Sequence, residues 1–227
     1  MSNSARKVFV LRTQKLFVGV SDEVLANVKM RFATFALGKA IVHHGQENPP
    51  LVLLVSGQAQ RSRYSEDGRE VGLGFVRPGE SFGEAAILLD TPAMATLTAV
   101  TSTLVGLVDR AEARTLFSDV ASSIHLAQVM ASKLERVIDT QAMITLPNSH
   151  ARIYAAILSA LAEDADGDKP HAEFPALSAI ALAANVSRET VSRAIRTLIA
   201  RGAIAKVNHR RFRLVDRQVL QELVAAS

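Results

Sequence analysis

The chain has 227 residues, of which 48% are hydrophobic and 21% charged, as is usual for one large or two small globular domains. This composition excludes a disordered or fibrous protein. No stretch approaches the ~18 apolar residues of a membrane span and no secretory signal is visible, so we expect a cytoplasmic protein without a membrane partner. The lack of cysteine excludes disulfides, thiolate metal sites and cysteine nucleophiles.

The positive charge is concentrated near the carboxyl end. The formal net charge is +4, but residues 188–217 hold nine lysines and arginines against two acids, a local +7 that leaves −3 for the rest. This distribution is typical of a protein that meets a polyanion with one part only, although a solvated charged face has the same appearance.

A short helix and a series of strands are predicted in the first half of the chain. Ser21 is a favourable N-cap for a helix over residues 21–28. Between residues 38 and 108, apolar bursts alternate with turn signals at a spacing of roughly 8–12 residues, which predicts a β barrel or sandwich. The bursts are Ala40–Val42, Leu51–Val55, Val71–Phe75, Leu97–Ala99 and Leu104–Leu107.

A long helix with a narrow apolar stripe is predicted next. From Ala127 the stripe steps by three and four residues, and the pattern ends at Leu146-Pro147. Its further members are Met130, Leu134, Val137, Gln141 and Ile144. Two interpretations stay open, because the stripe can pair with a second copy in a homodimer or can cover the β domain.

Two short helices joined by a tight turn are predicted near the carboxyl end. Their patterns cover residues 177–184 and 188–200, and Asn185-Val-Ser187 separates them. Asn185 suits a left-handed cap and Ser187 an N-cap. Two helices across a three-residue turn are typical of a helix-turn-helix.

The segments around this motif complete a small domain. A helix is predicted at Ala151–Leu161, followed by an acidic loop over residues 163–170. Residues 203–215 have the pattern of a hairpin whose tip, residues 208–211, is basic. We interpret this hairpin as a wing.

The second helix of the motif separates polar from apolar side chains. On a helical wheel Arg188, Glu189, Ser192, Arg193 and Arg196 lie opposite Val191, Ala194, Ile195 and Leu198. In a DNA major groove, arginine can bond guanine and glutamate can accept from cytosine, so this face can read bases. A simpler interpretation is that Glu189 only pairs with Arg193. We expect the arginines further along, which are Arg196, Arg201, Arg210 and Arg211, to contact phosphates.

The string Ser187-Arg-Glu-Thr-Val-Ser-Arg193 resembles the recognition helix of bacterial transcription regulators of the CRP/FNR superfamily, named after the cyclic-AMP receptor protein and the fumarate–nitrate regulator. Residues 51–57, 67–71 and 78–84 resemble the cyclic-nucleotide-binding β-roll of that family. The long helix is similar to its dimerisation helix, so the resemblance covers nearly the whole chain.

The resemblance implies an α+β fold in three parts. These are a β-roll (jelly roll) sensor over residues 1–118, a dimerisation helix over 119–146 and a winged helix-turn-helix over 147–227. It also implies a homodimeric, sequence-specific regulator of transcription that an effector controls allosterically and that contacts RNA polymerase.

The resemblance further implies the residues that read the DNA. Arg188, Glu189 and Arg193 would contact bases in each half-site, and Ser192 matches a reading position of the fumarate–nitrate branch. The implied target is double-stranded DNA with an inverted repeat of TGTGA-like or TTGA-containing half-sites.

The expected effector pocket departs from the family pattern where the cyclic phosphate is held. Gly83 and Glu84 match the Gly-Glu of relatives that bind cyclic AMP, but Met94 and Ala95 replace the Arg-Ser that follows it. A buried phosphate beside methionine would lack a charge partner.

The adenine side of the expected pocket also differs from the family pattern. An ungapped alignment places Val137 and Ile138 where the dimerisation helix would offer two hydroxyls. We therefore do not expect cyclic AMP bound in the usual manner.

The effector is otherwise open at this point. The six histidines, His43 and His44 among them, form no compact ligand pattern, so no metal site is expected. Cyclic di-GMP and a haem held by one histidine remain candidates, and the cofactor is unknown. No catalytic arrangement stands out, so we expect no enzyme. Two alternatives stay open, a nucleotide-binding regulatory module that acts through protein contacts and a DNA-binding regulator that needs no ligand.

Overall fold

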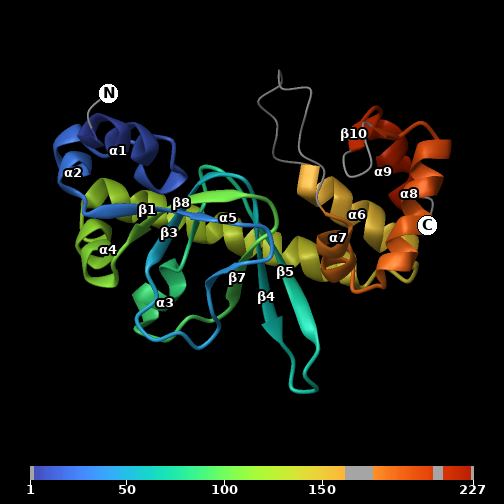
Figure 1. The fold of residues 1–227 in the computed structure, drawn as a ribbon, viewed down its shortest axis with the longest axis horizontal. Helices are drawn as coiled ribbons and strands as arrows, with labels where there is room; N and C mark the ends of the chain where they lie inside the picture. Colours follow the sequence, from blue (N-terminus) through green and yellow to red (C-terminus); the bar gives the residue numbers. More distant parts are fainter. Residues whose placement is uncertain (1–2, 162–175, 207–211, 226–227) are drawn as a thin grey trace. The chain divides into compact units, whose positions relative to one another are not determined.

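The computed structural model describes residues 3–161, 176–206 and 212–225. The chain divides into two compact units (Figure 1). The first comprises Met1–Arg63 and Gly74–Val137, and the second comprises Tyr64–Leu73 and Ile138–Ser227. Within the described residues, no helix combines the length and the hydropathy that crossing a bilayer requires.

Two four-stranded sheets confirm the predicted β domain, with strand orders β1-β8-β3-β6 and β2-β7-β4-β5. Strand β1 pairs antiparallel with β8, as do β3 with β8 and β4 with β7. The strands are β1 (Met30–Phe35), β2 (Ala40–Val42), β3 (Leu51–Ser56), β4 (Ala59–Tyr64), β5 (Glu70–Val76), β6 (Ser81–Phe82), β7 (Thr96–Ala99) and β8 (Thr103–Val108). The sequence did not predict β4, because Gln60, Arg61 and Ser62 break the apolar pattern.

Strand β3 is buried on both faces and separates two clusters of the core. Val52 and Leu54 point into the cluster between the sheets, and Leu51 and Leu53 point into the cluster beneath the helices. Alternate residues of a strand face opposite sides, so a strand covered on both sides has a continuous apolar run. Each fully buried leucine stabilises the fold by about 1.5–3 kcal/mol relative to an exposed one.

Helices cover the outer face of the first sheet. They are α1 (Asn3–Arg12), the 3₁₀ turn η1 (Lys15–Phe17), α2 (Asp22–Asn27), α3 (Glu84–Leu89) and α4 (Arg110–Phe117). The predicted helix at 21–28 is confirmed as α2, and the Ser21 side chain accepts a hydrogen bond from the Val24 amide. The sequence did not predict α1, which is held by burial of Val10 and Leu11 rather than by a strong amphipathic pattern.

The long helix α5 (Val120–Ile144) buries one face and exposes another. Leu126 is buried in the cluster beneath the helices, and Met130 packs against the same cluster. Four large apolar side chains on another face are exposed, and we call them the α5 stripe: Val120 (74% exposed), Ile124 (54%), Leu134 (62%) and Ile138 (56%). The sequence predicted Met130 as a member of the same stripe as Leu134, and this is corrected, because Met130 packs against the core while Leu134 is exposed. Helical periodicity alone does not tell which apolar face of α5 docks against the β domain. The side chain of Ile144 lies outside the described residues.

The second unit contains the predicted helix-turn-helix and hairpin. Helix α6 packs against the other helices, α7, α8 and α9, and β9 pairs antiparallel with β10. The elements are α6 (Ser149–Leu161), α7 (Leu177–Ala183), α8 (Arg188–Ala200), β9 (Ile204–Lys206), β10 (Phe212–Leu214) and α9 (Arg217–Ala225). The predicted acidic loop and the basic tip of the hairpin lie outside the described residues.

Candidate functional site

The turn between α7 and α8 sets where α8 begins. Asn185 has a φ of 50°, in the left-handed region, as the sequence predicted. The Ser187 hydroxyl accepts a hydrogen bond from the Thr190 amide at 3.2 Å and so caps α8. Both features are local in sequence, which is why they were predictable.

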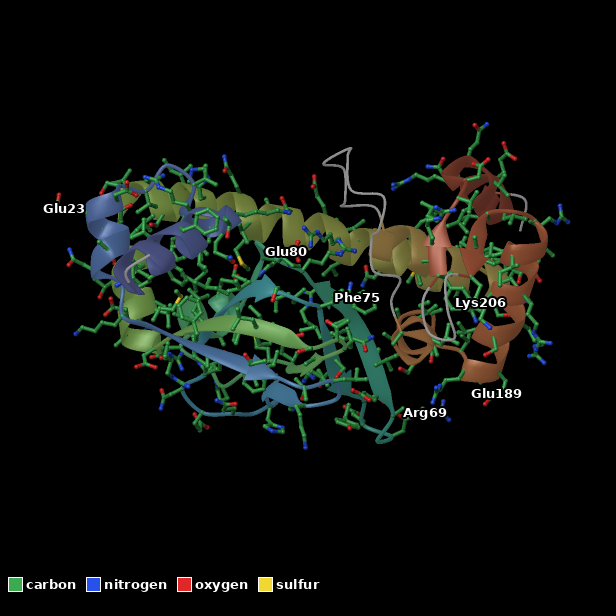
Figure 2. All side chains as sticks on the ribbon, turned by 45° about the horizontal axis from the view of Figure 1, so that its top comes forward. Glu23, Arg69, Phe75, Glu80, Glu189 and Lys206 are labelled. Carbon is green, nitrogen blue, oxygen red and sulfur yellow. The ribbon has the colours of Figure 1, made fainter. Side chains whose placement is uncertain are left out.

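Helix α8 docks through its apolar side and leaves its polar side open. Val191, Ala194, Ile195 and Leu198 are buried. Arg188, Glu189 and Arg193 are exposed, and Ser192 is half-buried. Figure 2 shows Glu189 at the surface, directed away from the helices of its unit. The structure thus brings the four predicted base-reading residues together on one side of α8.

A hydroxyl group that the sequence analysis did not single out orients Arg193. The Arg193 guanidinium donates through Nη2 to Thr190 Oγ1 at 3.2 Å, and Thr190 Oγ1 lies 3.0 Å from Ser187 Oγ. These contacts draw the guanidinium toward the first turn of α8. The signal in the sequence was the spacing of three residues between Thr190 and Arg193, which places both on one helix face.

Glu189 is held in its charged form. Its own backbone N–H, the Ser187 hydroxyl and the nearby Arg188 and Arg193 charges lower the pKa of its carboxyl group. The first turn of a helix also favours negative charge. The carboxylate is therefore available at neutral pH as a hydrogen-bond acceptor.

The basic residues expected to meet phosphates are only partly described. Arg196 and Arg201 are exposed, on α8 and at its carboxyl end. The Arg196 Nε donates to the Ser192 carbonyl at 3.4 Å. Arg210 and Arg211 lie outside the described residues.

Glu84, expected in the effector pocket, is buried in an ion pair. It begins α3 after Gly83, whose φ is 107° and where a Cβ atom would lie 2.7 Å from the Pro50 carbonyl oxygen, so only glycine fits. The Lys133 ammonium on α5 donates to both Glu84 carboxylate oxygens at 2.7 Å and to the Ser81 carbonyl at 2.9 Å. Burial alone raises the pKa of Glu84, but the Lys133 charge and the hydrogen bonds outweigh it and lower the pKa.

A second carboxylate nearby has a similar environment. Glu80 Oε1 lies 2.7 Å from Arg136 Nη1 and 3.6 Å from Lys15 Nζ, and Oε2 accepts from the Arg77 amide at 3.1 Å. Burial raises the pKa of Glu80. The charge and hydrogen bond of Arg136, the Arg77 amide and the charge of Lys15 outweigh burial and lower the pKa below its ordinary value. Both buried carboxylates are therefore ionised and matched by cations of α5.

A buried arginine on β4 lies in the electrostatic field of the same groups. Burial lowers the pKa of Arg61, while Glu80 and Glu84 raise it. No motif in the sequence assigned a role to Arg61, Glu80, Lys133 or Arg136. These charged residues stand between apolar residues in the sequence, and a solvated protein surface has the same pattern. The sequence therefore did not distinguish them from surface charges.

The other expected pocket residues differ in their exposure. Ala95 packs in the core between the sheets, and Met94 is 49% exposed. Val137 and Ile138 are exposed on α5. The structure thus offers a phosphate no cationic partner from the Met94-Ala95 segment.

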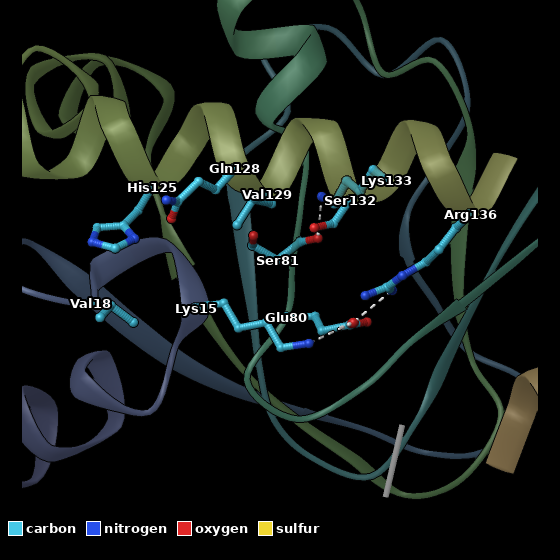
Figure 3. Close-up of a pocket in the computed structure, with 10 residues that line it drawn as sticks. All are labelled: Lys15, Val18, Glu80, Ser81, His125, Gln128, Val129, Ser132, Lys133 and Arg136. Atoms are coloured by element: carbon cyan, nitrogen blue, oxygen red, sulfur yellow. Dashed lines mark hydrogen bonds and ion pairs between the residues drawn. The ribbon is translucent and has the colours of Figure 1, made fainter. Parts of the chain in front are cut away.

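A cavity of about 330 Å³ lies beside this network, in the first unit (Figure 3). It is bounded by α5, by the segment around η1 and by the turn before β6. The lining residues are Lys15, Val18, Glu80, Ser81, His125, Gln128, Val129, Ser132, Lys133 and Arg136. None of the six expected effector residues is among them.

Two protein families match the chain. The cyclic nucleotide-binding domain matches residues 32–119, and the Crp-like helix-turn-helix domain matches residues 151–223. The chain belongs to the CRP/FNR family of transcription regulators. As in that family, its carboxyl-terminal domain is a DNA-binding helix-turn-helix.

Individual CRP/FNR relatives resemble the chain over most of its length. The CRP-like cAMP-activated global transcriptional regulator of Mycobacterium tuberculosis is 26% identical over 202 residues, 86% of this chain and 90% of that protein. The cyclic AMP receptor protein of Thermus thermophilus is 28% identical over 202 residues, 86% of this chain and 89% of that protein. The crystal structure of TTHB099, a CRP-family transcriptional regulator from the same bacterium, has a TM-score of 0.66 at 27% identity and covers 85% of this chain and 96% of its own.

Proposed function

We propose that this CRP/FNR regulator binds an inverted-repeat DNA site in the cytoplasm as a homodimer. Each copy presents α8 to the major groove, with Arg188, Glu189, Ser192 and Arg193 toward the bases. The observation that carries this proposal is the exposure of the polar side of α8 around a fully buried apolar side. The N-terminal turn of such a helix is the part that reaches base edges. Arg196, Arg201, Arg210 and Arg211 bind phosphates.

The chemistry of the α8 residues supports reading of G·C pairs. An arginine can donate two parallel hydrogen bonds to guanine O6 and N7, and a carboxylate can accept from cytosine N4, each pair discriminating by roughly 1–3 kcal/mol. Glu189 suits the second role because its exposed carboxylate is ionised at neutral pH and can accept hydrogen bonds. Arg193 suits the first because Thr190 orients its guanidinium.

The α5 stripe is the surface through which two copies associate. Val120 and Ile124 are four residues apart, as are Leu134 and Ile138, and the exposed Ala127 and Ala131 lie between the two pairs at heptad spacing. Small and large apolar residues in this order form the seam of a two-stranded coiled coil. A large apolar surface on a helix favours such pairing over exposure to water. An inverted repeat requires a two-fold dimer, which is why the occupant is a second copy.

The effector of this regulator is not cyclic AMP bound in the usual manner. Glu84 is already charge-compensated within the fold, because Lys133 donates to both of its carboxylate oxygens. Met94 and Ala95 supply no charge for the phosphate. Cyclic di-GMP, haem and regulation without a ligand are the remaining candidates.

Allosteric control acts through α5. This helix carries both the cations that pair with Glu84 and Glu80 and the apolar stripe for the second copy. A ligand that competes for those carboxylates shifts the balance between arrangements of α5. The DNA-bound dimer then presents a surface to RNA polymerase.

The proposal is tested by selecting duplexes from a random pool and measuring Kd on the selected and on a scrambled duplex. Arg193→Ala lowers the ratio of the two affinities by about tenfold or more, whereas Arg210→Ala weakens both alike. Unchanged ratios in both variants would contradict base reading by α8. Failure to select any duplex would favour a module that acts through protein contacts.

The same titration, repeated with cyclic AMP, cyclic di-GMP or haem, tests the effector. We expect the apo protein to bind the selected duplex and cyclic AMP to change its affinity by less than about tenfold. A larger gain with cyclic AMP would show that the exclusion of this nucleotide is wrong.

A further inference from the structure

The cavity of about 330 Å³ between α5 and the η1 segment has the composition of an anion-binding site (Figure 3). We propose that it binds a small organic anion through a carboxylate or phosphate group, at a site that adjoins the residues expected to contact a cyclic nucleotide but includes none of them. The volume falls in the range of small-molecule pockets. All of its lining residues belong to the first unit, so this unit contains the whole site.

Cationic side chains outnumber carboxylates among the residues that line the cavity. Lys15, Lys133 and Arg136 line it, against the single carboxylate Glu80. Lys133 is matched by Glu84, which is not among the residues that line the cavity. Arg136 and Lys15 therefore share Glu80, and Lys15 is the more loosely held, at 3.6 Å against 2.7 Å. Lys15 can therefore serve as the charge partner of an anion in the cavity.

Three further polar side chains on α5 complete the site. His125, Gln128 and Ser132 lie on successive turns of the helix, so they form a row along one wall. Their side chains make no hydrogen bond with any residue that the structure describes. Figure 3 shows this row on one side of the cavity and Lys15 and Glu80 on the other. The row can bond the hydroxyl or carbonyl groups of a molecule whose oxyanion lies against Lys15.

The site adjoins the expected effector pocket through Lys133, which pairs with Glu84, and it lies on another face of α5 than the α5 stripe. Its lining includes none of the residues that the family resemblance assigned to the effector pocket. The cavity face of α5 lies about 150° around the helix from the α5 stripe, at 100° per residue. Pairing of two copies through that stripe therefore leaves the cavity accessible.

The inference is tested by calorimetric titration of the full chain with inorganic phosphate and, separately, with succinate. We expect saturable binding of at least one probe, and the stronger of the two identifies the oxyanion. Lys15→Met, at a side chain that is 59% exposed and so dispensable for folding, weakens binding about tenfold or more. Gln128→Leu, also at an exposed position, weakens it without any change of charge.

The matched control is Lys39→Met, which removes an exposed lysine elsewhere in the first unit. Its affinity stays within about twofold of the unmodified chain. An equal loss in Lys39→Met and Lys15→Met, or no saturation below about 10 mM for either probe, would overturn the site. No DNA is present in this titration, so its result is independent of base reading by α8.

Discussion

The Lys133 ammonium lies 2.7 Å from both carboxylate oxygens of Glu84, and 49 residues separate the two in sequence. This pair joins α5 to the start of α3 within the first unit. Removing one partner of a buried ion pair lowers the free energy of unfolding far more than replacing both partners with uncharged residues. The reason is that the remaining buried charge then has no counter-charge.

We first predict an acid-dependent loss of stability. The folded-state pKa of Glu84, like that of Glu80, is below the ordinary value of 4.5. The two ion pairs therefore stabilise the fold fully above the unfolded-state pKa, and this contribution is lost as the pH falls through the folded-state values. The free energy of unfolding, measured in urea, should be level near pH 7 and decrease below about pH 5. A constant value down to pH 3 would contradict this reading.

The second prediction concerns the pair itself. Lys133→Met leaves a buried carboxylate without a counter-charge and should lower the free energy of unfolding by about 3–5 kcal/mol. The double variant Glu84→Gln with Lys133→Met should recover most of that loss, because no charge is then buried. Urea unfolding followed by circular dichroism measures both. Equal stability of the single and the double variant would show that the two side chains are not coupled.

Thr190 offers a test of how Arg193 is oriented. Thr190→Val keeps the shape of the side chain but removes the hydroxyl that accepts from the guanidinium. The ratio of affinities for the selected and the scrambled duplex should decrease by about three- to tenfold, which is less than the decrease expected for Arg193→Ala. Thr190→Ser should restore it, because the hydroxyl returns. If the valine variant discriminates like the unmodified protein, Thr190 does not position Arg193.

Arg201, at the carboxyl end of α8, should contribute affinity without specificity. Arg201→Ala should weaken binding to all duplexes alike and reduce the slope of log K against log salt by about 1. Arg31→Ala, at an exposed arginine of the first unit, is the control and should leave the slope unchanged. A sequence-dependent effect of Arg201→Ala would instead place this side chain against a base.

The α5 stripe is tested by placing a charge in its middle. Leu134→Glu should raise the dimer dissociation constant about a hundredfold or more, because the carboxylate would have to be buried in the seam. Sedimentation equilibrium measures the constant, and Glu135→Lys, at an exposed position beside the stripe, is the control. A Leu134→Glu protein that stays dimeric would exclude this face as the contact between copies.

Elements with strong local signals were predictable from the sequence. The start of α8 follows from the Ser187 cap, and the turn before it follows from the left-handed Asn185. Strand β3 was visible as an apolar run. Strand β4 and helix α1 were not, because polar residues interrupt the first and distant packing holds the second.

The sequence by itself determined the kind of protein and the residues that share the polar face of α8. Residues on one short helix share a face through helical spacing alone, so no tertiary contact is needed to group Arg188, Glu189 and Arg193. The tertiary structure decided which side chains of the first unit contact one another and which face of α5 is exposed. Only folding brings Lys133 to Glu84 and Arg136 to Glu80, and only docking selects Met130 for the core and Leu134 for the surface. The physical reason is that charges and apolar side chains far apart in the chain find their partners through packing, which local periodicity does not encode.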